Sequence, residues 1–255
     1  MVLTDTHTHL YYENDIEKRQ ALMQRCLEKN ISRLFLPNVD LSSVTQVFDL
    51  ADAYPQNCFA MLGLHPCDVK EGWETQLDAI IAAGNGKKIY AIGEIGIDLY
   101  WDKTTLAQQQ AAFKKQINWA KQLDLPIVIH CRNAFDEVFA VLQEENDEKL
   151  RGIFHCFSGT LQQAQQVIAL GFYLGIGGVV TYKNAGLDKI VEQIDLKDMV
   201  LETDSPYLTP VPNRGRPNES SYLVYIAQKI ADLHQVSVET VAAITTENSV
   251  KIFGV

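Results

Sequence analysis

The residues best suited to chemistry in this sequence are four histidines and two carboxylates at predicted strand ends. His7 and His9 follow the first predicted strand, and because a strand repeats every two residues, their imidazoles face the same side. Four more candidates lie at or just beyond the ends of later strands: Glu94, His130, His155 and Asp204. Such mixed nitrogen and oxygen donors suit zinc, manganese or a related divalent ion better than calcium.

The number of these residues indicates a centre with more than one ion. Six ligands are too many for a tetrahedral site with an open position, but they suit two metals that share a bridging carboxylate. A lone buried histidine is more often structural than functional. The combination of a His-x-His pair with four further donors at matching strand ends favours a metal site instead.

Several neighbouring residues have weaker signals. Cys131 and Cys156 each follow a proposed ligand histidine, but adjacent strand residues face opposite sides, so we interpret both cysteines as structural. Asp5 shares the parity of His7 and either orients a ligand imidazole or makes a plain interior hydrogen bond. His65 and Arg132 lie in predicted loops near the same strand ends and are candidates for contacting substrate.

Short apolar segments alternate with longer helical ones along the whole chain. The predicted strands are Val2–Thr6, Arg33–Leu36, Phe59–Leu64, Ile89–Ile92, Ile127–His130, Gly152–His155, Phe172–Ile176 and Met199–Glu202. The predicted helices are Ile16–Lys29, Ser42–Ala53, Trp73–Ala83, Thr104–Leu123, Ala134–Glu148, Leu161–Leu170, Leu187–Ile194, Tyr222–His234 and Val238–Phe253. This alternation predicts an α/β fold with a parallel sheet.

Eight strand–helix units in 255 residues favour a single (β/α)₈ TIM-like barrel domain over residues 1–255, with additional C-terminal helices. An open doubly wound sheet is the alternative, although no GxGxxG follows the first strand. In a barrel the carboxyl ends of all strands form one face, which is where active sites lie. The six candidate ligands would therefore converge there.

Composition excludes several classes of protein. Apolar residues make up 47% and charged residues 21% of the chain, as in ordinary globular proteins. No apolar run is long enough to span a membrane, and the N-terminus lacks the basic and apolar regions of a signal peptide. Five cysteines without a regular framework indicate a reduced, cytoplasmic setting. The net charge of −10 argues against a broad nucleic-acid-binding surface. We expect neither a membrane nor an obligatory protein partner.

The ordered motifs resemble those of the TatD-type metal-dependent deoxyribonucleases, which are amidohydrolase-like metal hydrolases. The matching segments are Thr4–Leu10, Gly63–Pro66, Gly93–Asp98, His130–Arg132, His155–Gly159 and Glu202–Leu208. The resemblance implies a dinuclear centre in which one metal is bound by His7, His9, Glu94 and Asp204, and the second by His130, His155 and the bridging Glu94. It also implies hydrolysis of DNA phosphodiesters, in some members as a 3′-to-5′ exonuclease. The loop Arg214–Ser220 departs from the family pattern, which affects the expected substrate preference more than the metal site.

Three hypotheses about function follow. In the first, two divalent ions (Zn, Mn or Mg) activate water against a phosphodiester, Asp204 orients or deprotonates that water, and His65 and Arg132 contact phosphate. The acidic chain then predicts a DNA or oligonucleotide substrate with single-stranded ends, bound in a small local pocket. In the second, the same centre attacks a carbonyl, as an amidase, a lactonase or a deacylase such as one acting on D-aminoacyl-tRNA. In the third, the metals stabilise a non-catalytic interaction protein.

Overall fold

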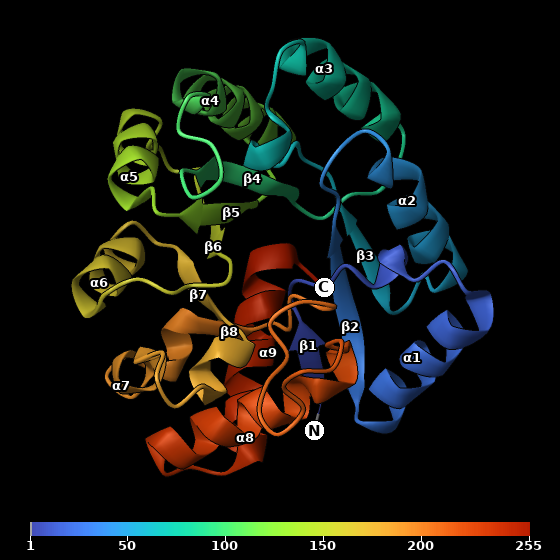
Figure 1. The fold of residues 1–255 in the computed structure, drawn as a ribbon, viewed down its shortest axis with the longest axis vertical. Helices are drawn as coiled ribbons and strands as arrows, with labels where there is room; N and C mark the ends of the chain where they lie inside the picture. Colours follow the sequence, from blue (N-terminus) through green and yellow to red (C-terminus); the bar gives the residue numbers. More distant parts are fainter. Residues whose placement is uncertain (1) are drawn as a thin grey trace.

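The computed structural model describes residues 2–255 and places eight parallel strands in a ring, with helices around its outside (Figure 1). The strands are β1 Leu3–Asp5, β2 Ile31–Pro37, β3 Cys58–Met61, β4 Ile92–Asp98, β5 Ile127–Arg132, β6 Gly152–Phe154, β7 Tyr173–Ile176 and β8 Met199–Leu201. The α-helices are α1 Ile16–Glu28, α2 Ser43–Ala53, α3 Trp73–Gly84, α4 Leu106–Leu123, α5 Phe135–Glu144, α6 Leu161–Ala169, α7 Leu187–Val191, α8 Leu223–His234 and α9 Val238–Phe253. The predicted elements are present with small shifts at most ends, except that the predicted fourth strand overlaps β4 at Ile92 alone.

Regular strand pairing forms two sheets rather than one closed sheet. The first has the order β1-β2-β3 and the second β4-β5-β6-β7-β8. Isolated bridges connect their edges: Leu62 pairs with Ile92 on one side, and Thr8 pairs with Ser205 on the other. The amide of Thr6 also donates to the carbonyl of Leu201 at 3.0 Å. The predicted parallel α/β fold is therefore confirmed, whereas the predicted continuous barrel is not seen in the regular ladders.

One apolar core connects the two sheets. Buried side chains from β2, β3, β5, β6 and β8 meet in a single cluster, together with residues at the end of α9. Phe35 of β2 stacks on Phe253 of α9 with ring centroids 3.8 Å apart. The helices pack outside through a second, larger cluster. Close packing of this kind holds the strand ends, and therefore the residues on them, in fixed positions.

The main error in the predicted elements concerns the fourth strand. The prediction ended it at Ile92, so that Glu94 followed the strand, but β4 runs from Ile92 to Asp98 and contains Glu94. The glycines, which usually disfavour a strand, are needed here for close approach to β5. Gly96 has a φ of +138°, and a Cβ atom there would lie 2.1 Å from the carbonyl oxygen of His130. The motif is therefore a strand in which glycine permits tight pairing.

The cysteines and helices bear on the predicted environment. All five cysteines are free, and Cys26 and Cys58 are buried. Within residues 2–255, no helix has both the length and the apolarity of a membrane span. The cytoplasmic setting stays a prediction.

Candidate metal centre

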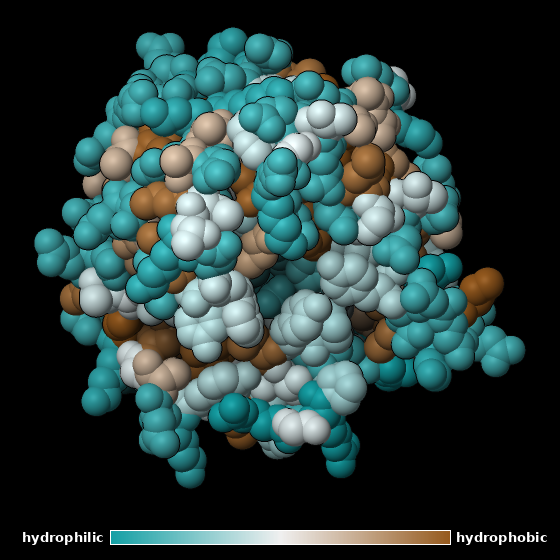
Figure 2. All heavy atoms as spheres, turned by 45° about the horizontal axis from the view of Figure 1, so that its top comes forward, coloured by the Kyte–Doolittle hydropathy of each residue, from teal (hydrophilic) through white to brown (hydrophobic). Residues whose placement is uncertain are grey.

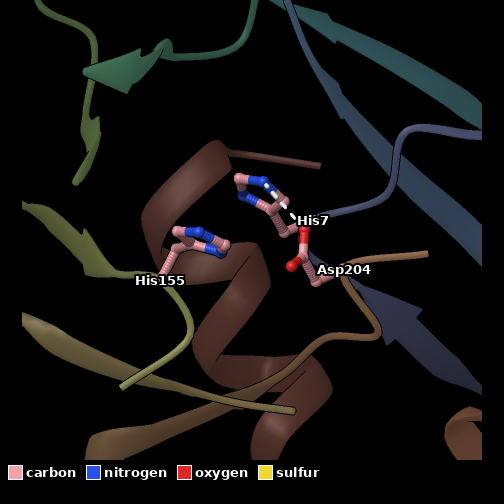
Figure 3. A group of neighbouring side chains, drawn as sticks. All are labelled: His7, His155 and Asp204. Atoms are coloured by element: carbon pink, nitrogen blue, oxygen red, sulfur yellow. Dashed lines mark ion pairs between the residues drawn. The ribbon is translucent and has the colours of Figure 1, made fainter. Parts of the chain in front are cut away.

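The predicted ligands come together at the carboxyl ends of the strands. His7 and His9 follow β1, His155 follows β6, and His130 lies within β5. Asp204 follows β8 with a left-handed φ of 55°. Figure 3 shows His7, His155 and Asp204 converging from three separate segments of the chain. The rings of His7 and His155 stack with centroids 3.7 Å apart, and the Nε2 of His7 lies 3.9 Å from the Oδ1 of Asp204.

Glu94 lies between two groups of donors. Its Oε2 is 3.2 Å from the Nε2 of His7 and 3.9 Å from that of His9. Its Oε1 is 2.7 Å from the Nδ1 of His130 and 3.1 Å from the Nε2 of His155. Asp204 joins the first group, with its Oδ1 3.4 Å from the Nε2 of His9. The two carboxylate oxygens of Glu94 thus face separate groups of imidazoles, with His65 also 3.3 Å from Oε1, and this is the arrangement of a bridging ligand.

The donor set suits a divalent cation. His7 is fully buried, and neither of its ring nitrogens has a hydrogen-bond partner among residues 2–255. A buried polar atom without a partner is costly unless a ligand satisfies it. Three groups of donor atoms within 4.8 Å of one another occur among the described residues. They are His7 with His155 and Asp204, His7 with His9 and Glu94, and His65 with Glu94 and His130.

Outer hydrogen bonds set the tautomer of His9. The hydroxyl of Tyr11 donates to the carbonyl of Pro37 at 2.5 Å, so its oxygen is left to accept. The Nδ1 of His9 lies 2.8 Å from that oxygen and must carry the hydrogen. The lone pair of His9 is then on Nε2, which faces Glu94 and Asp204. A metal ligand needs this tautomer.

Two carboxylates act in the same way on the other side of Glu94. The Oδ2 of Asp98 lies 2.8 Å from the Nε2 of His130. The Oε1 of Glu202 lies 3.3 Å from the Nδ1 of His155. Each carboxylate favours a hydrogen on the outer ring nitrogen, so the nitrogen that faces Glu94 is the one available to a metal.

Glu202 itself is held tightly. It is fully buried, and its Oε1 accepts the amide hydrogen of Cys156 at 2.5 Å. A Cβ atom on Gly175 would lie 2.3 Å from its Oε2, so only glycine leaves room for this carboxylate.

His65 has the opposite tautomer. Its Nδ1 accepts the amide hydrogen of Cys67 at 3.1 Å, so its Nε2 carries the hydrogen. That nitrogen points toward the Oε1 of Glu94 at 3.3 Å. Burial lowers the pKa of His65, which keeps the ring neutral near pH 7. His65 therefore presents a hydrogen-bond donor to the centre, which fits its predicted contact with substrate better than a role as ligand.

The electrostatics prepare Glu94 as an anionic ligand. Burial raises the pKa of Glu94, but the nearby imidazoles of His155, His65 and His7 together outweigh burial and hold that pKa well below its ordinary value. Burial lowers the pKa of His155, yet the carboxylates of Glu94 and Glu202 raise it well above the ordinary value. For His130, burial is likewise outweighed by Asp98 and Glu94, so its pKa is raised. In the metal-free chain these carboxylates therefore favour the protonated form of both rings.

Metal binding should accordingly release protons. Because the pKa values of His130 and His155 are raised, a cation competes with protons for both rings, and metal affinity should fall as pH drops. Calorimetric titration with Mn²⁺ in buffers of different ionisation enthalpy measures the number of protons released. We expect a net release of protons on binding. Binding without proton release, or with affinity independent of pH between 5.5 and 7.5, would contradict this assignment.

The hydrogen bond of Tyr11 gives a second prediction. Tyr11→Phe removes the acceptor that fixes the tautomer of His9, so metal affinity should fall by about 10- to 100-fold, the range for lost outer partners of ligand histidines. Competition with a fluorescent chelator measures this affinity. Tyr12→Phe is the matched control, because Tyr12 stacks on the ring of His9 but makes no hydrogen bond to it among residues 2–255. Equal affinities of the two variants would show that the hydroxyl of Tyr11 is not needed.

The hydrogen bonds of Asp5 distinguish between its two predicted roles. It is buried, and its carboxylate accepts hydrogen bonds from the Thr203 amide, the Thr203 hydroxyl and the backbone amide of His7. Burial raises the pKa of Asp5 to about 7. Among residues 2–255 it makes no hydrogen bond to an imidazole. The structure therefore supports the interior hydrogen bond, which joins the segments after β1 and β8.

The other predicted residues have mixed outcomes. No cysteine belongs to the donor groups found among residues 2–255, in line with the structural role predicted for Cys131 and Cys156. Cys131 lies in β5, where successive side chains alternate between the two faces of the strand. Cys156 follows the end of β6 with a φ of 47°, so strand alternation does not apply to it. Arg132 is exposed, and its guanidinium lies over the ring of Tyr100 at 3.8 Å. Its contact with substrate stays a prediction.

Two outer residues were not found from the sequence. Tyr11 continues the odd-numbered series of Asp5, His7 and His9, but it lies in a short 3₁₀ turn where strand alternation no longer applies. Glu202 stands at the end of the predicted eighth strand, where a carboxylate in a buried position was itself a signal.

Known proteins similar to this chain include metal-dependent hydrolases, in agreement with a candidate metal centre. The family model described as TatD related DNase matches residues 4–254. The metal-dependent hydrolase YabD of Bacillus subtilis is 38% identical, over 99% of both chains. The 3′-5′ ssDNA/RNA exonuclease TatD of Salmonella typhimurium is 33% identical, over 93% of both chains. The crystal structure of YjjV, a TatD homologue from Escherichia coli, superposes with a TM-score of 0.93 and 28% identity, covering 99% of this chain and 98% of that one. This chain therefore belongs to the TatD-related family of metal-dependent hydrolases.

Proposed function

We propose that this protein hydrolyses phosphodiester bonds in single-stranded DNA, releasing nucleotides from the 3′ end, with two divalent cations bound at the candidate centre. The observation that carries the proposal is the position of Glu94, whose two oxygens face separate groups of imidazoles. Two cations joined by one carboxylate are common in enzymes that hydrolyse phosphodiesters. The Salmonella relative named as a 3′-5′ exonuclease supports the same substrate class.

The residues divide between the two proposed ions. His7, His9 and Asp204 would hold one cation, His130 and His155 the other, and Glu94 would bridge them. Bound cations would lower the pKa of a water molecule and stabilise the charge that develops on the phosphate. Because Zn, Mn and Mg all accept part of this donor set, the proposal names a divalent ion and not one metal. The bridges between the two sheets, with the shared apolar core, are the basis for proposing one barrel domain as the support.

The side chains of the protein would position the reactants and move protons. Hydrogen bonds and charges from His9, His155 and His7 outweigh the burial that raises the pKa of Asp204, so this pKa lies below its ordinary value. Its carboxylate is therefore ionised and can orient and accept the proton of the attacking water. The Nε2–H of His65 would donate to a phosphoryl oxygen. As the new P–O bond forms, the bond to the 3′-oxygen breaks, and that oxygen leaves with a proton from solvent.

The negative charge of the chain favours a short or single-stranded substrate over a long duplex. At −10 the surface offers little non-specific attraction to a long duplex, and two divalent cations would change the total only to −6. A hollow occurs near the centre of the face seen in Figure 2, which suits a single strand end. We therefore propose single-stranded ends or short oligonucleotides as the substrate, and tight binding of long duplex DNA at physiological salt would contradict it.

Carbonyl hydrolysis remains the second candidate, and one cavity favours it. A cavity of about 350 Å³ opens beside His9 and Ser205, between α1 and the segment after β8. Apolar side chains form much of its wall: Leu10, Ala21, Leu22, Pro206 and Pro217. Of the two cations that line it, Arg25 is already paired with Glu219 at 2.6 Å, and the exposed Lys18 lies 3.8 Å from a carboxylate oxygen of Asp15. Such a wall would also accept the acyl part of an ester or lactone.

One comparison separates the two candidates. The Mn²⁺-loaded protein is incubated in parallel with a single-stranded DNA 20-mer, its duplex, and a panel of carboxylic esters, lactones and D-aminoacyl esters. The proposal predicts release of mononucleotides from the single strand, slower release from the duplex and no turnover of the panel. Turnover of the panel without release of nucleotides would favour the carbonyl hydrolase.

A further inference from the structure

An exposed aromatic pair beside the metal centre has no role in the mechanism above. Trp101 is 71% exposed and Tyr100 is 52% exposed, whereas the two other tryptophans of the chain are each 8% exposed. Large aromatic side chains gain considerable stability from burial, so the exposure of two neighbouring rings calls for a binding role.

Hydrogen bonds hold the backbone of the pair, and the two rings contact each other and Arg132. The Oδ1 of Asp98 accepts the amide hydrogens of Tyr100 at 2.8 Å and of Trp101 at 3.2 Å. The two rings meet edge to face, with centroids 4.9 Å apart. The guanidinium of Arg132 lies 3.8 Å from the centroid of Tyr100 and 5.6 Å from that of Trp101. Such preorganised contacts reduce the entropy lost on binding.

The cluster is directly connected to the metal centre. The same Asp98 contacts the Nε2 of His130 through its other oxygen, at 2.8 Å. Arg132 follows His130 by two residues on β5, and its carbonyl accepts the amide hydrogen of Leu99 at 3.0 Å. The aromatic pair is therefore joined to the metal centre through Asp98 and the strand that carries His130 and Arg132.

We propose that Tyr100, Trp101 and Arg132 form a stacking site for a nucleobase of single-stranded DNA, on the His130 side of the metal centre. Aromatic faces stack on any base, and an arginine beside them adds a cation for the backbone. Arg132 makes no ion pair among residues 2–255, so its N–H groups are free for a phosphate. The exposed Lys103 adds a second cation on the same loop. The proposal rests on the proposed nuclease function and adds the way in which the strand is held.

Tryptophan fluorescence tests this site without turnover. The Mn²⁺-loaded protein is titrated with a phosphorothioate-linked oligomer of six deoxythymidines, which resists hydrolysis. Because Trp101 is the exposed tryptophan, stacking should quench its emission. Trp101→Phe should lose the quenching but keep its affinity, measured by anisotropy of a fluorescein-labelled oligomer. Trp101→Ala should bind about tenfold more weakly, the loss that follows removal of one stacked base.

Two controls isolate the stacking. Leu123→Ala changes another exposed apolar side chain, 47% exposed, at the far end of α4, and should leave the affinity unchanged. An abasic oligomer with the same phosphates should bind the unaltered protein as weakly as the base-containing oligomer binds Trp101→Ala. Equal affinity for the two oligomers, or unchanged affinity in Trp101→Ala, would overturn the stacking site.

The outcome is separable from that of the proposed function. Release of nucleotides by the unaltered protein, together with base-independent binding, would reject the stacking site and leave the nuclease standing. Base-dependent binding that Trp101→Ala weakens, without hydrolysis of ordinary DNA under any metal, would support the stacking site while rejecting the nuclease.

Discussion

Replacing Glu94 with glutamine is expected to remove metal from both halves of the centre. One oxygen of Glu94 faces His7 and His9, and the other faces His130 and His155. Glutamine has nearly the same shape but supplies one neutral acceptor and one N–H₂ group, which would point hydrogens at a pair of imidazoles. The loss should exceed the roughly 100-fold that removal of an outer partner causes at most.

Metal analysis after dialysis checks this prediction. The unaltered protein should retain close to two equivalents of Mn²⁺ or Zn²⁺, and Glu94→Gln should retain well below one. Glu239→Gln is the control, because Glu239 is exposed in the first turn of α9 and should leave the metal content unchanged. If Glu94→Gln kept two equivalents with ordinary affinity, the bridging role would be wrong.

Asp204→Asn should remove nearly all hydrolysis while the protein stays folded. Asp204 lies close to both His7 and His9, and it is the carboxylate proposed to accept the proton of the attacking water. Asparagine is isosteric but cannot accept that proton. Loss of a general base costs about 10²- to 10⁴-fold in kcat, and loss of a ligand oxygen adds to it. KM should change much less than kcat.

Steady-state release of mononucleotides from a single-stranded oligonucleotide measures the effect. Asp136→Asn is the matched control, since Asp136 is an exposed aspartate in the first turn of α5. Circular dichroism and metal analysis of Asp204→Asn separate a catalytic loss from unfolding or metal loss. A kcat within threefold of that of the unaltered protein would exclude Asp204 from proton transfer.

The location of the candidate ligands could be predicted from the sequence because it depends on topology alone. In a parallel α/β fold all strands end at the same side, so residues at those ends meet regardless of their separation along the chain. His7 and Asp204, nearly 200 residues apart by their numbers, illustrate this, since the amide of Asp204 donates to the carbonyl of His7 at 2.9 Å. The strand positions of His130 and His155 were also correct within one or two residues.

The outer partners depend on local geometry that spacing does not reveal. Tyr11 reaches His9 only because a 3₁₀ turn follows the pair of histidines. The left-handed conformation of Cys156 ends the alternation after β6, so its orientation could not be predicted from parity. The pairing of β4 with β5 through Gly96 turned an apparent loop into a strand. Each case involves a short-range backbone conformation that competes with a regular pattern.

The partners of the outer ring nitrogens also determine which histidines offer a lone pair to a metal and which one offers an N–H. Hydrogen bonds to Tyr11 and Asp98, and the Glu202 carboxylate 3.3 Å from His155, favour a lone pair facing inward on their histidines. The amide of Cys67 instead leaves an N–H facing inward on His65. The proposed division between metal ligands and a substrate contact therefore has a physical basis in the tautomers.

The most direct test of the account is a titration of activity with metal. Metal-free protein receives Mn²⁺ in steps from zero to four equivalents, and release of mononucleotides from single-stranded DNA is measured at each step. We expect no release without metal. The rate of mononucleotide release should rise steeply between one and two equivalents of Mn²⁺ and then stay constant. Full activity at one equivalent, or release that continues in the metal-free protein, would contradict a two-metal phosphodiesterase.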